Sequence, residues 1–389
     1  MKMRKSQRGS RKISGGFDVH RNSAVLDPDM SRKVVRYARK RMAKSRIDDF
    51  VHEDVEKVPL LKHSQLILGE RLGQGSFSSV YAVQAIGSED SQEFDSHRIV
   101  VKVLRPKLSA TPPMFSACAA DLVKEGMIMA TLNHRNIVSA KAWAPNGVSA
   151  YGNGRHDAFF LVLDRLEMIL GGRIIDWQKQ NKKINFSLTS RQSKRIALLR
   201  ERINVIMELS EAIKFMHSKK VLHRDLKPDN IGFDCDRVLK VFDFDVARIV
   251  PDSSVPDDTF MLTKRVGSPR YMCPECARGE EYNLKADVYT FGLLYHELIT
   301  LEKPYEDVPA GLHDEMVFYE GYRPSIPNSW PEAMKNLIQR CWSENISSRP
   351  TMEEAHQILK QAIPLIVAEK DGKKGKSKST RRSTKTLPV

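Results

Sequence analysis

Short apolar runs fill the part of the chain between residues 66 and 166. Four of them end near Gly, Ser, Asn or Asp, and they cover residues 65–73, 78–86, 98–104 and 158–164. Runs of this length with such boundaries are typical of strands in an antiparallel sheet. Between the third and fourth runs, apolar residues recur at helical spacing over 120–132, which predicts one helix. The inserts 87–98 and 144–157 are expected to be solvated loops.

Beyond residue 195 the apolar spacing changes to that of helices. Four segments show it, at 195–218, 285–300, 332–342 and 352–363. We therefore expect an α+β, bilobal fold, with a small antiparallel β lobe containing one helix and a larger α-helical lobe. The predicted divisions are an N-terminal extension at 1–65, a folded domain at 66–366 with its lobes meeting at 166/167, and a tail at 367–389.

The positive charge lies outside this predicted domain. The net charge is +15, of which residues 1–47 carry +12 and residues 369–389 carry +6, so the middle is slightly acidic. A folded nucleic-acid module would carry its own basic face. Residues 31–47 could form a basic helix with Ser31 as its N-cap. This helix is either a solvated arm or a segment that docks on an acidic partner, a membrane or nucleic acid, and the tail is expected to be disordered.

Composition restricts the environment of the protein. No apolar run approaches the roughly 18 residues of a membrane span, and no apolar segment follows the basic start. Five cysteines, an odd number, are typical of reduced thiols. We therefore expect an intracellular protein, cytoplasmic or nuclear. Cys273 and Cys276 form a C-x-x-C pattern, which we interpret as structural because a metal or redox site needs a second ligand pair or a thioredoxin-like context.

A glycine-rich motif lies between the first two predicted strands. In residues 72–81, Gly73 and Gly75 are followed by Ser78. Glycines in such a turn let the backbone approach phosphate oxygens, although a tight hairpin without a ligand has the same composition. Further along, Lys102 lies within an apolar strand, where an ammonium needs an anionic partner, and Glu125 on the predicted helix is the natural one.

The most specific motif is His-Arg-Asp-Leu-Lys-Pro-Asp-Asn at 223–230, followed by Val-Phe-Asp-Phe-Asp at 241–245. Two acids and an amide beside short apolar strands provide oxygen ligands for a hard cation. Together with the motifs before them, these residues resemble the protein-kinase family in order from about 66 to 364. The resemblance implies a protein kinase that uses ATP and Mg²⁺ and acts on protein substrates.

The resemblance also implies a role for individual residues. Asp225 would accept the substrate proton, Lys227 would neutralise the transferring phosphoryl group, and Lys102 would hold the α- and β-phosphates while paired with Glu125. Asn230 and Asp243 would bind Mg²⁺. The other ATP-binding residues would be Leu72, Gly73, Gly75, Ser78, Val80, Val100, Leu163, Asp164 and Leu166.

Further residues would hold the large lobe and regulate it. Glu275 would pair with Arg349, and Asp287 would anchor the catalytic loop through its backbone. Thr263, or else Thr259, would be the activation-loop phosphorylation site, paired with Arg224. Either hydroxyl could equally be one that is never phosphorylated.

Lys227 and Ser268 resemble those of serine/threonine kinases, and 341–352 resembles their tyrosine-kinase-like branch; dual specificity stays open. Asp245 replaces the glycine of the Asp-Phe-Gly motif, and Gly232 replaces a larger residue under the adenine, which predicts a thinner pocket floor. The alternative function is a non-catalytic pseudokinase scaffold. A further alternative is a kinase tethered to nucleic acid, an acidic partner or a membrane surface by its basic tails.

Overall fold

The structure is a computed structural model that describes residues 25–45, 47, 53–87, 94–186, 191–251, 253, 255, 257–328 and 330–372. Most of the two basic ends lies outside the described residues. Of the tail predicted at 367–389 to be disordered, residues 367–372 instead continue the last helix (Met352–Gly372), and the rest is outside the described residues. By its internal contacts the chain divides into two units. Among the described residues, the first contains those within 25–44, 59–123 and 141–163, and the second contains those within 45–58, 124–140 and 164–372.

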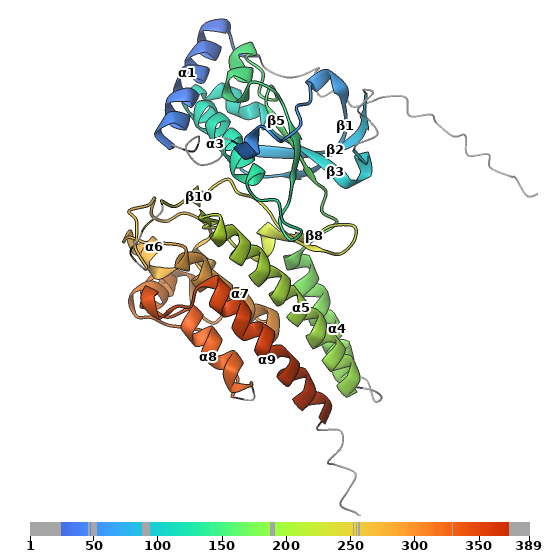
Figure 1. The fold of residues 1–389 in the computed structure, drawn as a ribbon, viewed down its shortest axis with the longest axis vertical. Helices are drawn as coiled ribbons and strands as arrows, with labels where there is room; N and C mark the ends of the chain where they lie inside the picture. Colours follow the sequence, from blue (N-terminus) through green and yellow to red (C-terminus); the bar gives the residue numbers. More distant parts are fainter. Residues whose placement is uncertain are drawn as a thin grey trace, which may run out of the picture. The chain divides into compact units, whose positions relative to one another are not determined.

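The first unit is built around a five-stranded sheet in the order β1-β2-β3-β5-β4 (Figure 1). Both β1 with β2 and β2 with β3 pair antiparallel, as the apolar runs predict. The sequence did not predict β4, because four residues are too few to show a period. The strands are β1 (Leu66–Gln74), β2 (Ser78–Ile86), β3 (Ile99–Leu104), β4 (Ala140–Trp143) and β5 (Phe160–Asp164).

The predicted helix of this region is longer than its periodicity indicates. Helix α3 spans Pro112–Ala130, so it starts at Pro112 instead of Ala120. Its first turns carry two prolines and several small residues, which hide the helical spacing, but Phe115 and Ala119 are both fully buried. Packing of these two side chains against the rest of the unit extends the helix toward its N-terminus.

The N-terminal extension contains a helix whose cap differs from the prediction. Helix α1 spans Pro28–Ser45. The Asp27 carboxylate accepts hydrogen bonds from the backbone amides of Asp29 and Met30, each at 3.0 Å. Asp27 is therefore the N-cap, and the prediction of Ser31 was wrong. Ser31 lies inside the first turns, where its hydroxyl donates to the Asp27 carbonyl oxygen at 2.9 Å.

Helix α1 is not a solvated arm, because its apolar stripe packs into the first unit. Val34, Ala38 and Met42 are buried. The Arg41 guanidinium forms an ion pair of 3.0 Å with Asp121 of α3, and the two helices lie side by side (Figure 1). The small apolar residues at helical spacing suffice to pack α1, while its charged residues stay outside.

The insert at 144–157 also packs into the first unit instead of forming a solvated loop. Tyr151 is fully buried and its ring meets that of Phe115 edge to face at 5.4 Å between centroids. Gly154 has a φ of +78°, and a Cβ there would lie 2.5 Å from the Leu26 carbonyl oxygen. Glycine at this position therefore allows the chain before α1 to approach the insert.

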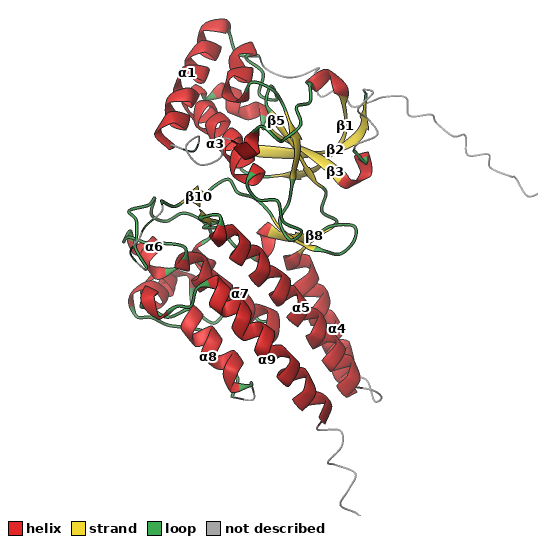
Figure 2. Cartoon of the chain, in the orientation of Figure 1, coloured by secondary structure: helices red, strands yellow, loops and turns green. Residues whose placement is uncertain are grey.

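The second unit is mainly helical (Figure 2). Its core helix α7 is buried along nearly its whole length, and α5 packs against both α7 and α9. The sequence predicted these helices and α8 but not α4, whose start carries two glycines. The helices are α4 (Leu170–Phe186), α5 (Arg191–Ser218), α6 (Pro274–Arg278), α7 (Lys285–Thr300), α8 (Glu332–Cys341) and α9 (Met352–Gly372).

Short strands in the second unit fix the loops that carry the conspicuous polar residues. Three form a small sheet in the order β6-β8-β9, and two more form the pair β10-β7. They are β6 (Met168–Ile169), β7 (Val221–Leu222), β8 (Ile231–Phe233), β9 (Leu239–Val241) and β10 (Arg248–Ile249). The architecture is α+β, as predicted. Among the described residues, no helix is both long and apolar enough to cross a membrane.

The packing of α1 predicts different effects for substitutions on its two faces. Ala38 is 0% exposed and the neighbouring Tyr37 is 52% exposed. Ala38→Asp places an unpaired carboxylate in the interior and is expected to lower the free energy of unfolding by roughly 2–4 kcal/mol. Tyr37→Asp, the matched control, should change it by no more than about 0.5 kcal/mol. Denaturant unfolding of both variants measures the difference, and equal effects would contradict the packed helix.

Candidate functional site

Three of the predicted nucleotide-binding residues lie in a row across the sheet of the first unit. Gly73 on β1 pairs with Val80 on β2, and Val80 pairs in turn with Lys102 on β3. Lys102 is 6% exposed and lies in a strand that is buried throughout. The strand register therefore places Lys102 two strands away from Gly73, at the same level of the sheet. Of the other predicted residues, Val100 and Leu163 are buried, while Leu72 is 41% exposed.

The glycine-rich turn does not need glycine for its own backbone. The Gly75 amide donates to the Ser78 carbonyl oxygen at 2.9 Å, which closes the turn. Gly73 and Gly75 are absent from the described glycines with positive φ. A Cβ at Gly73 would meet only Val80, at 4.0 Å, and a Cβ at Gly75 would lie 3.5 Å from the Ser78 hydroxyl oxygen. The missing side chains leave open space at the turn instead of relieving strain.

Arg105 supports this turn, a contact that the sequence did not predict. Its guanidinium donates to the carbonyl oxygens of Gly75 at 3.2 Å and Ser76 at 2.9 Å. Its backbone amide donates to the Phe77 carbonyl oxygen at 2.9 Å. The only signal in the sequence is a cation directly after β3, which is too common to indicate such a contact.

In the second unit, a buried carboxylate holds the start of the 223–230 loop. The Asp287 side chain accepts the backbone amides of His223 at 2.8 Å and Arg224 at 3.0 Å, and it hydrogen bonds to the His217 ring at 3.2 Å. Burial by itself raises the pKa of Asp287, but the His217 hydrogen bond and the nearby imidazoles outweigh it and lower the pKa below its ordinary value. Asp287 is therefore ionised, as three donors around one carboxylate require.

Asp225 receives hydrogen bonds on both oxygens. The Ser268 amide donates to Oδ1 at 2.8 Å, while the Lys227 ammonium and the Asn230 amide donate to Oδ2 at 2.6 Å and 3.0 Å. Lys227 also donates to the Ser268 hydroxyl at 2.9 Å. The close approach depends on Gly267, where φ is +93° and a Cβ would lie 2.3 Å from the Arg224 carbonyl oxygen. Asp225, Lys227, Asn230 and Ser268 thus form one connected polar site.

The segment after β9 is tied to the same loop. The Phe242 amide donates to the Asn230 carbonyl oxygen at 3.0 Å. The Phe242 carbonyl oxygen lies 3.2 Å from the His223 ring nitrogen. Arg224 and Asp243 have φ values of 69° and 68°, in the left-handed region. Non-glycine residues there cost of order 1 kcal/mol or more and persist only where the surroundings fix them.

Three carboxylates gather where the sequence predicts a metal. The side chains of Glu125, Asp243 and Asp245 each offer an oxygen, and these atoms lie within 4.8 Å of one another. The sequence predicted Asp243 as a metal ligand with Asp245 beside it, but it predicted Glu125 as the ion-pair partner of Lys102. Lys102 and Glu125 belong to different units, and their pairing stays a prediction.

The predicted Glu275–Arg349 pair is present and fully buried. Arg349 Nη1 and Nη2 donate to the two carboxylate oxygens of Glu275 at 2.7 and 2.9 Å, with side-chain exposures of 0% for Arg349 and 3% for Glu275. The remaining donors of Arg349 reach the carbonyl oxygens of Ser343 and Lys285. Burial raises the pKa of Glu275, but the Arg349 bonds outweigh it, so the pKa lies below its ordinary value.

The predicted phosphorylation sites differ in their surroundings. Thr263 is exposed, whereas Thr259 is half-buried and its hydroxyl donates to Glu281 at 3.1 Å. The Arg224 guanidinium donates to the Val246 carbonyl oxygen at 2.8 Å and to the Tyr282 hydroxyl at 3.1 Å. The Tyr282 hydroxyl in turn donates to the Thr263 carbonyl oxygen at 2.7 Å. Arg224 therefore reaches the Thr263 backbone through Tyr282.

The space beside Gly232 is occupied by a residue that the sequence placed in the nucleotide pocket. A Cβ at Gly232 would lie 2.9 Å from Leu166 Cδ1 and 3.0 Å from the Met168 carbonyl oxygen. The prediction of a thinner floor was therefore incomplete, because Leu166 fills the volume. The side chain of Asp164 makes structural contacts. Its carboxylate accepts a hydrogen bond from the Ser139 amide at 2.8 Å and lies 3.5 Å from the Lys240 ammonium.

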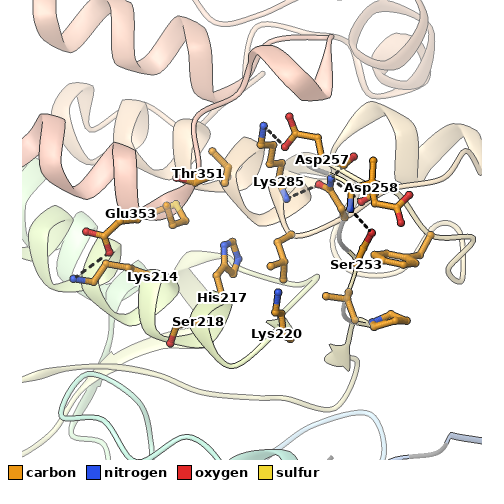
Figure 3. Close-up of a pocket in the computed structure, with 18 residues that line it drawn as sticks. Lys214, His217, Ser218, Lys220, Ser253, Asp257, Asp258, Lys285, Thr351 and Glu353 are labelled. Atoms are coloured by element: carbon orange, nitrogen blue, oxygen red, sulfur yellow. Dashed lines mark hydrogen bonds and ion pairs between the residues drawn. The ribbon is translucent and has the colours of Figure 1, made fainter.

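A cavity of about 390 Å³ lies elsewhere in the second unit (Figure 3). The end of α5 and the starts of α7 and α9 line it, with ion pairs between Lys285 and Asp257 at 2.6 Å and between Lys214 and Glu353 at 3.7 Å. His217, which binds Asp287, is part of its wall. Among its described lining residues, none belongs to the predicted catalytic or nucleotide-binding set.

The loop, the carboxylates and the buried ion pair together define a protein-kinase domain. The family model of protein tyrosine and serine/threonine kinases matches residues 66–359, and the chain belongs to this family. The matched region starts with β1 and ends within α9.

Curated relatives carry names of the same kind. The chain is 28% identical over 304 residues to a probable serine/threonine-protein kinase of Dictyostelium discoideum, covering 77% of this chain and 28% of the relative. It is 28% identical over 317 residues to the serine/threonine-protein kinase STY46 of Arabidopsis thaliana, covering 82% and 47%. It is 25% identical over 324 residues to the dual specificity protein kinase pyk3 of Dictyostelium discoideum, covering 83% and 20%. The chain therefore spans less than half the length of each of these relatives.

The Glu275–Arg349 pair predicts a large loss of stability when one partner is removed. Glu275→Gln leaves a buried guanidinium without its counter-charge, and we expect the free energy of unfolding to fall by about 3–5 kcal/mol. Denaturant unfolding measures this change. The control is Asp314→Asn, which breaks an exposed ion pair with Arg265 and should have little effect. A similar small effect of both substitutions would contradict the structural role of the buried pair.

Proposed function

We propose that the protein is a serine/threonine protein kinase that transfers the γ-phosphoryl group of ATP to a protein hydroxyl. The observation that carries the proposal is the arrangement around Asp225. Its carboxylate is held on both oxygens by Ser268, Lys227 and Asn230. A carboxylate fixed in this way suits a group that orients a hydroxyl and accepts its proton.

Lys227 supplies positive charge at the same place. Its ammonium contacts both Asp225 and the Ser268 hydroxyl, so its position is fixed before a substrate arrives. Phosphoryl transfer develops little new covalent structure and gains most of its rate from positioning and charge stabilisation. Asp225 and Lys227 meet these two requirements.

The acidic cluster suits Mg²⁺. Asp243 offers carboxylate oxygens beside Glu125 and Asp245, and carboxylates so close repel unless cations lie near them. Asn230 donates to Asp225 through its amide nitrogen, so those bonds do not use its amide oxygen. Asp243 and Asn230 would hold the ion, which when bound neutralises charge on the phosphates.

The first unit supplies the residues proposed for the nucleotide. The turn at Gly73 and Gly75 has room for phosphate oxygens and is held by Arg105. Lys102, in the same row of the sheet as Gly73, would bind the α- and β-phosphates. Leu72, Val80, Val100 and Leu163 would contact the base, and the resemblance to protein kinases gives the same role to Asp164 and Leu166.

Serine/threonine specificity rests on Lys227 and Ser268 and on the names of most relatives. One relative is named a dual specificity kinase, so analysis of the phosphorylated amino acids is part of the test. We also propose regulation by phosphorylation of Thr263, because this residue is exposed and its carbonyl oxygen is linked to Arg224 through Tyr282.

The second candidate function is a scaffold without catalysis. Asp245 favours it, because a third carboxylate within 4.8 Å of the predicted metal ligand adds a side chain and a charge to the metal site. The scaffold and the enzyme differ in one measurable respect, which is transfer of phosphate under conditions where nucleotide binds.

Transfer from labelled ATP to a generic protein substrate tests the proposal. We expect phosphoserine and phosphothreonine as products, and loss of transfer when Mg²⁺ is chelated. Asp225→Asn keeps the size of the side chain but removes the proton acceptor, so the rate should fall by about a hundredfold or more.

The control for this loss is nucleotide affinity, measured in the presence of Mg²⁺. Asp225→Asn should bind nucleotide as the wild type does, while Asp243→Asn should lose metal-dependent binding. Wild-type transfer no faster than that of Asp225→Asn, with nucleotide bound to both, would reject the enzyme in favour of the scaffold.

A further inference from the structure

Two cysteines occupy facing positions at the start of helix α6. Cys273 is the N-cap residue of the helix Pro274–Arg278, and Cys276 is its third residue. Side chains at these two positions lie on the same side of the first helical turn, which is why in a capping box each can reach the backbone of the other residue. The sequence favoured purely structural cysteines because it showed no second ligand pair. It could not show that both thiols are free and buried at the two facing positions of one helical turn.

The contact makes the two sulfur atoms chemically different. A hydrogen bond with the Cys273 thiol lowers the pKa of Cys276 to about 6, while burial raises the pKa of Cys273. Near neutral pH, Cys276 is thus a thiolate and Cys273 is the thiol that donates to it. An acidic nucleophilic cysteine beside a second thiol is the arrangement that converts an oxidised sulfur into a disulfide.

We propose that Cys273 and Cys276 are a redox couple that closes to an intramolecular disulfide in the presence of hydrogen peroxide. The Cys276 thiolate attacks one peroxide oxygen, the O–O bond breaks, and hydroxide leaves and takes up a proton to become water. The resulting sulfenic acid is attacked by the Cys273 sulfur, which loses its proton. The S–S bond forms, and the sulfenic oxygen leaves as a second water. Two thiols are oxidised and one peroxide is reduced.

Burial restricts the oxidant. Cys273 is 3% exposed and Cys276 is 4% exposed. A peroxide molecule is little larger than water, whereas a bulky thiol reagent would react first with the exposed Cys235. The couple is thus selective for small oxidants, and we expect it to react more slowly than an exposed thiol would.

The position of the couple links it to the proposed kinase activity, on which the following consequence rests. Cys276 lies close to the Tyr282 side chain, whose hydroxyl accepts from Arg224, the neighbour of Asp225. Glu275, between the two cysteines, holds Arg349. A disulfide removes the charge on the Cys276 sulfur and draws that sulfur toward Cys273, which changes the surroundings of Tyr282, so the oxidised protein should transfer phosphate more slowly.

The test uses the full chain with Cys235→Ser as background, which removes the exposed thiol. Hydrogen peroxide is added, and intact mass, peptide mapping and phosphate transfer are measured before and after dithiothreitol. We expect a loss of about 2 Da, for two hydrogen atoms, a peptide carrying a Cys273–Cys276 bond, and slower transfer, all reversed by dithiothreitol. Cys273→Ser and Cys276→Ser in the same background should lack the bond.

The peptide map reports the couple even if one of these variants fails to fold or if the protein transfers no phosphate. Absence of transfer in the reduced protein would reject the proposed kinase function and leave the couple standing if the bond forms. Peroxide that leaves both thiols unlinked, or that takes Cys276 to irreversible acids, would overturn the couple. A bond that forms without slowing transfer would overturn its effect on catalysis.

Discussion

The structure of the catalytic loop depends on one buried carboxylate. Asp287 accepts two consecutive backbone amides, from His223 and Arg224, and binds His217 with a third contact. This arrangement allows Arg224 to stay in the left-handed conformation, which its side chain disfavours. The turn that follows presents Asp225 to Lys227, Asn230 and Ser268. Without the carboxylate, two buried amides would lack acceptors, at a cost of about 1–3 kcal/mol each.

A second buried charge fixes the other side of the same site. The Glu275–Arg349 pair holds the segment that contains Ser268. Helix α7 carries both Asp287 and Lys285, whose carbonyl oxygen accepts a hydrogen bond from Arg349. The same helix therefore carries Asp287, which holds the 223–230 loop, and Lys285, which contacts the Arg349 that binds Glu275. Positions held by buried charges are costly to change, which suits a site whose chemistry depends on positioning.

The sequence predicted those parts of the site that lie in recognisable motifs of the protein-kinase family. Asp225, Asp287 and the Glu275–Arg349 pair lie in motifs that resemble those of the protein-kinase family, and this resemblance, not their local spacing, implied their contacts. The sequence did not predict Arg105, the filling of the space at Gly232 by Leu166, or the contact of Glu125 with Asp243 and Asp245. These contacts join residues far apart in sequence, and nothing in their local pattern marks them. The same limit explains α1, whose apolar stripe predicted a helix but not that this stripe is buried in the first unit.

Single-turnover phosphate transfer by Asp287→Asn tests the central claim most directly. The substituted amide keeps the shape of the side chain but presents a donor to one of two backbone amides that need an acceptor. In a variant whose thermal unfolding shows that it is folded, we predict a transfer rate about tenfold or more below that of the wild type, with nucleotide affinity unchanged. A folded variant that transfers phosphate at the wild-type rate would show that the buried carboxylate does not organise the catalytic loop.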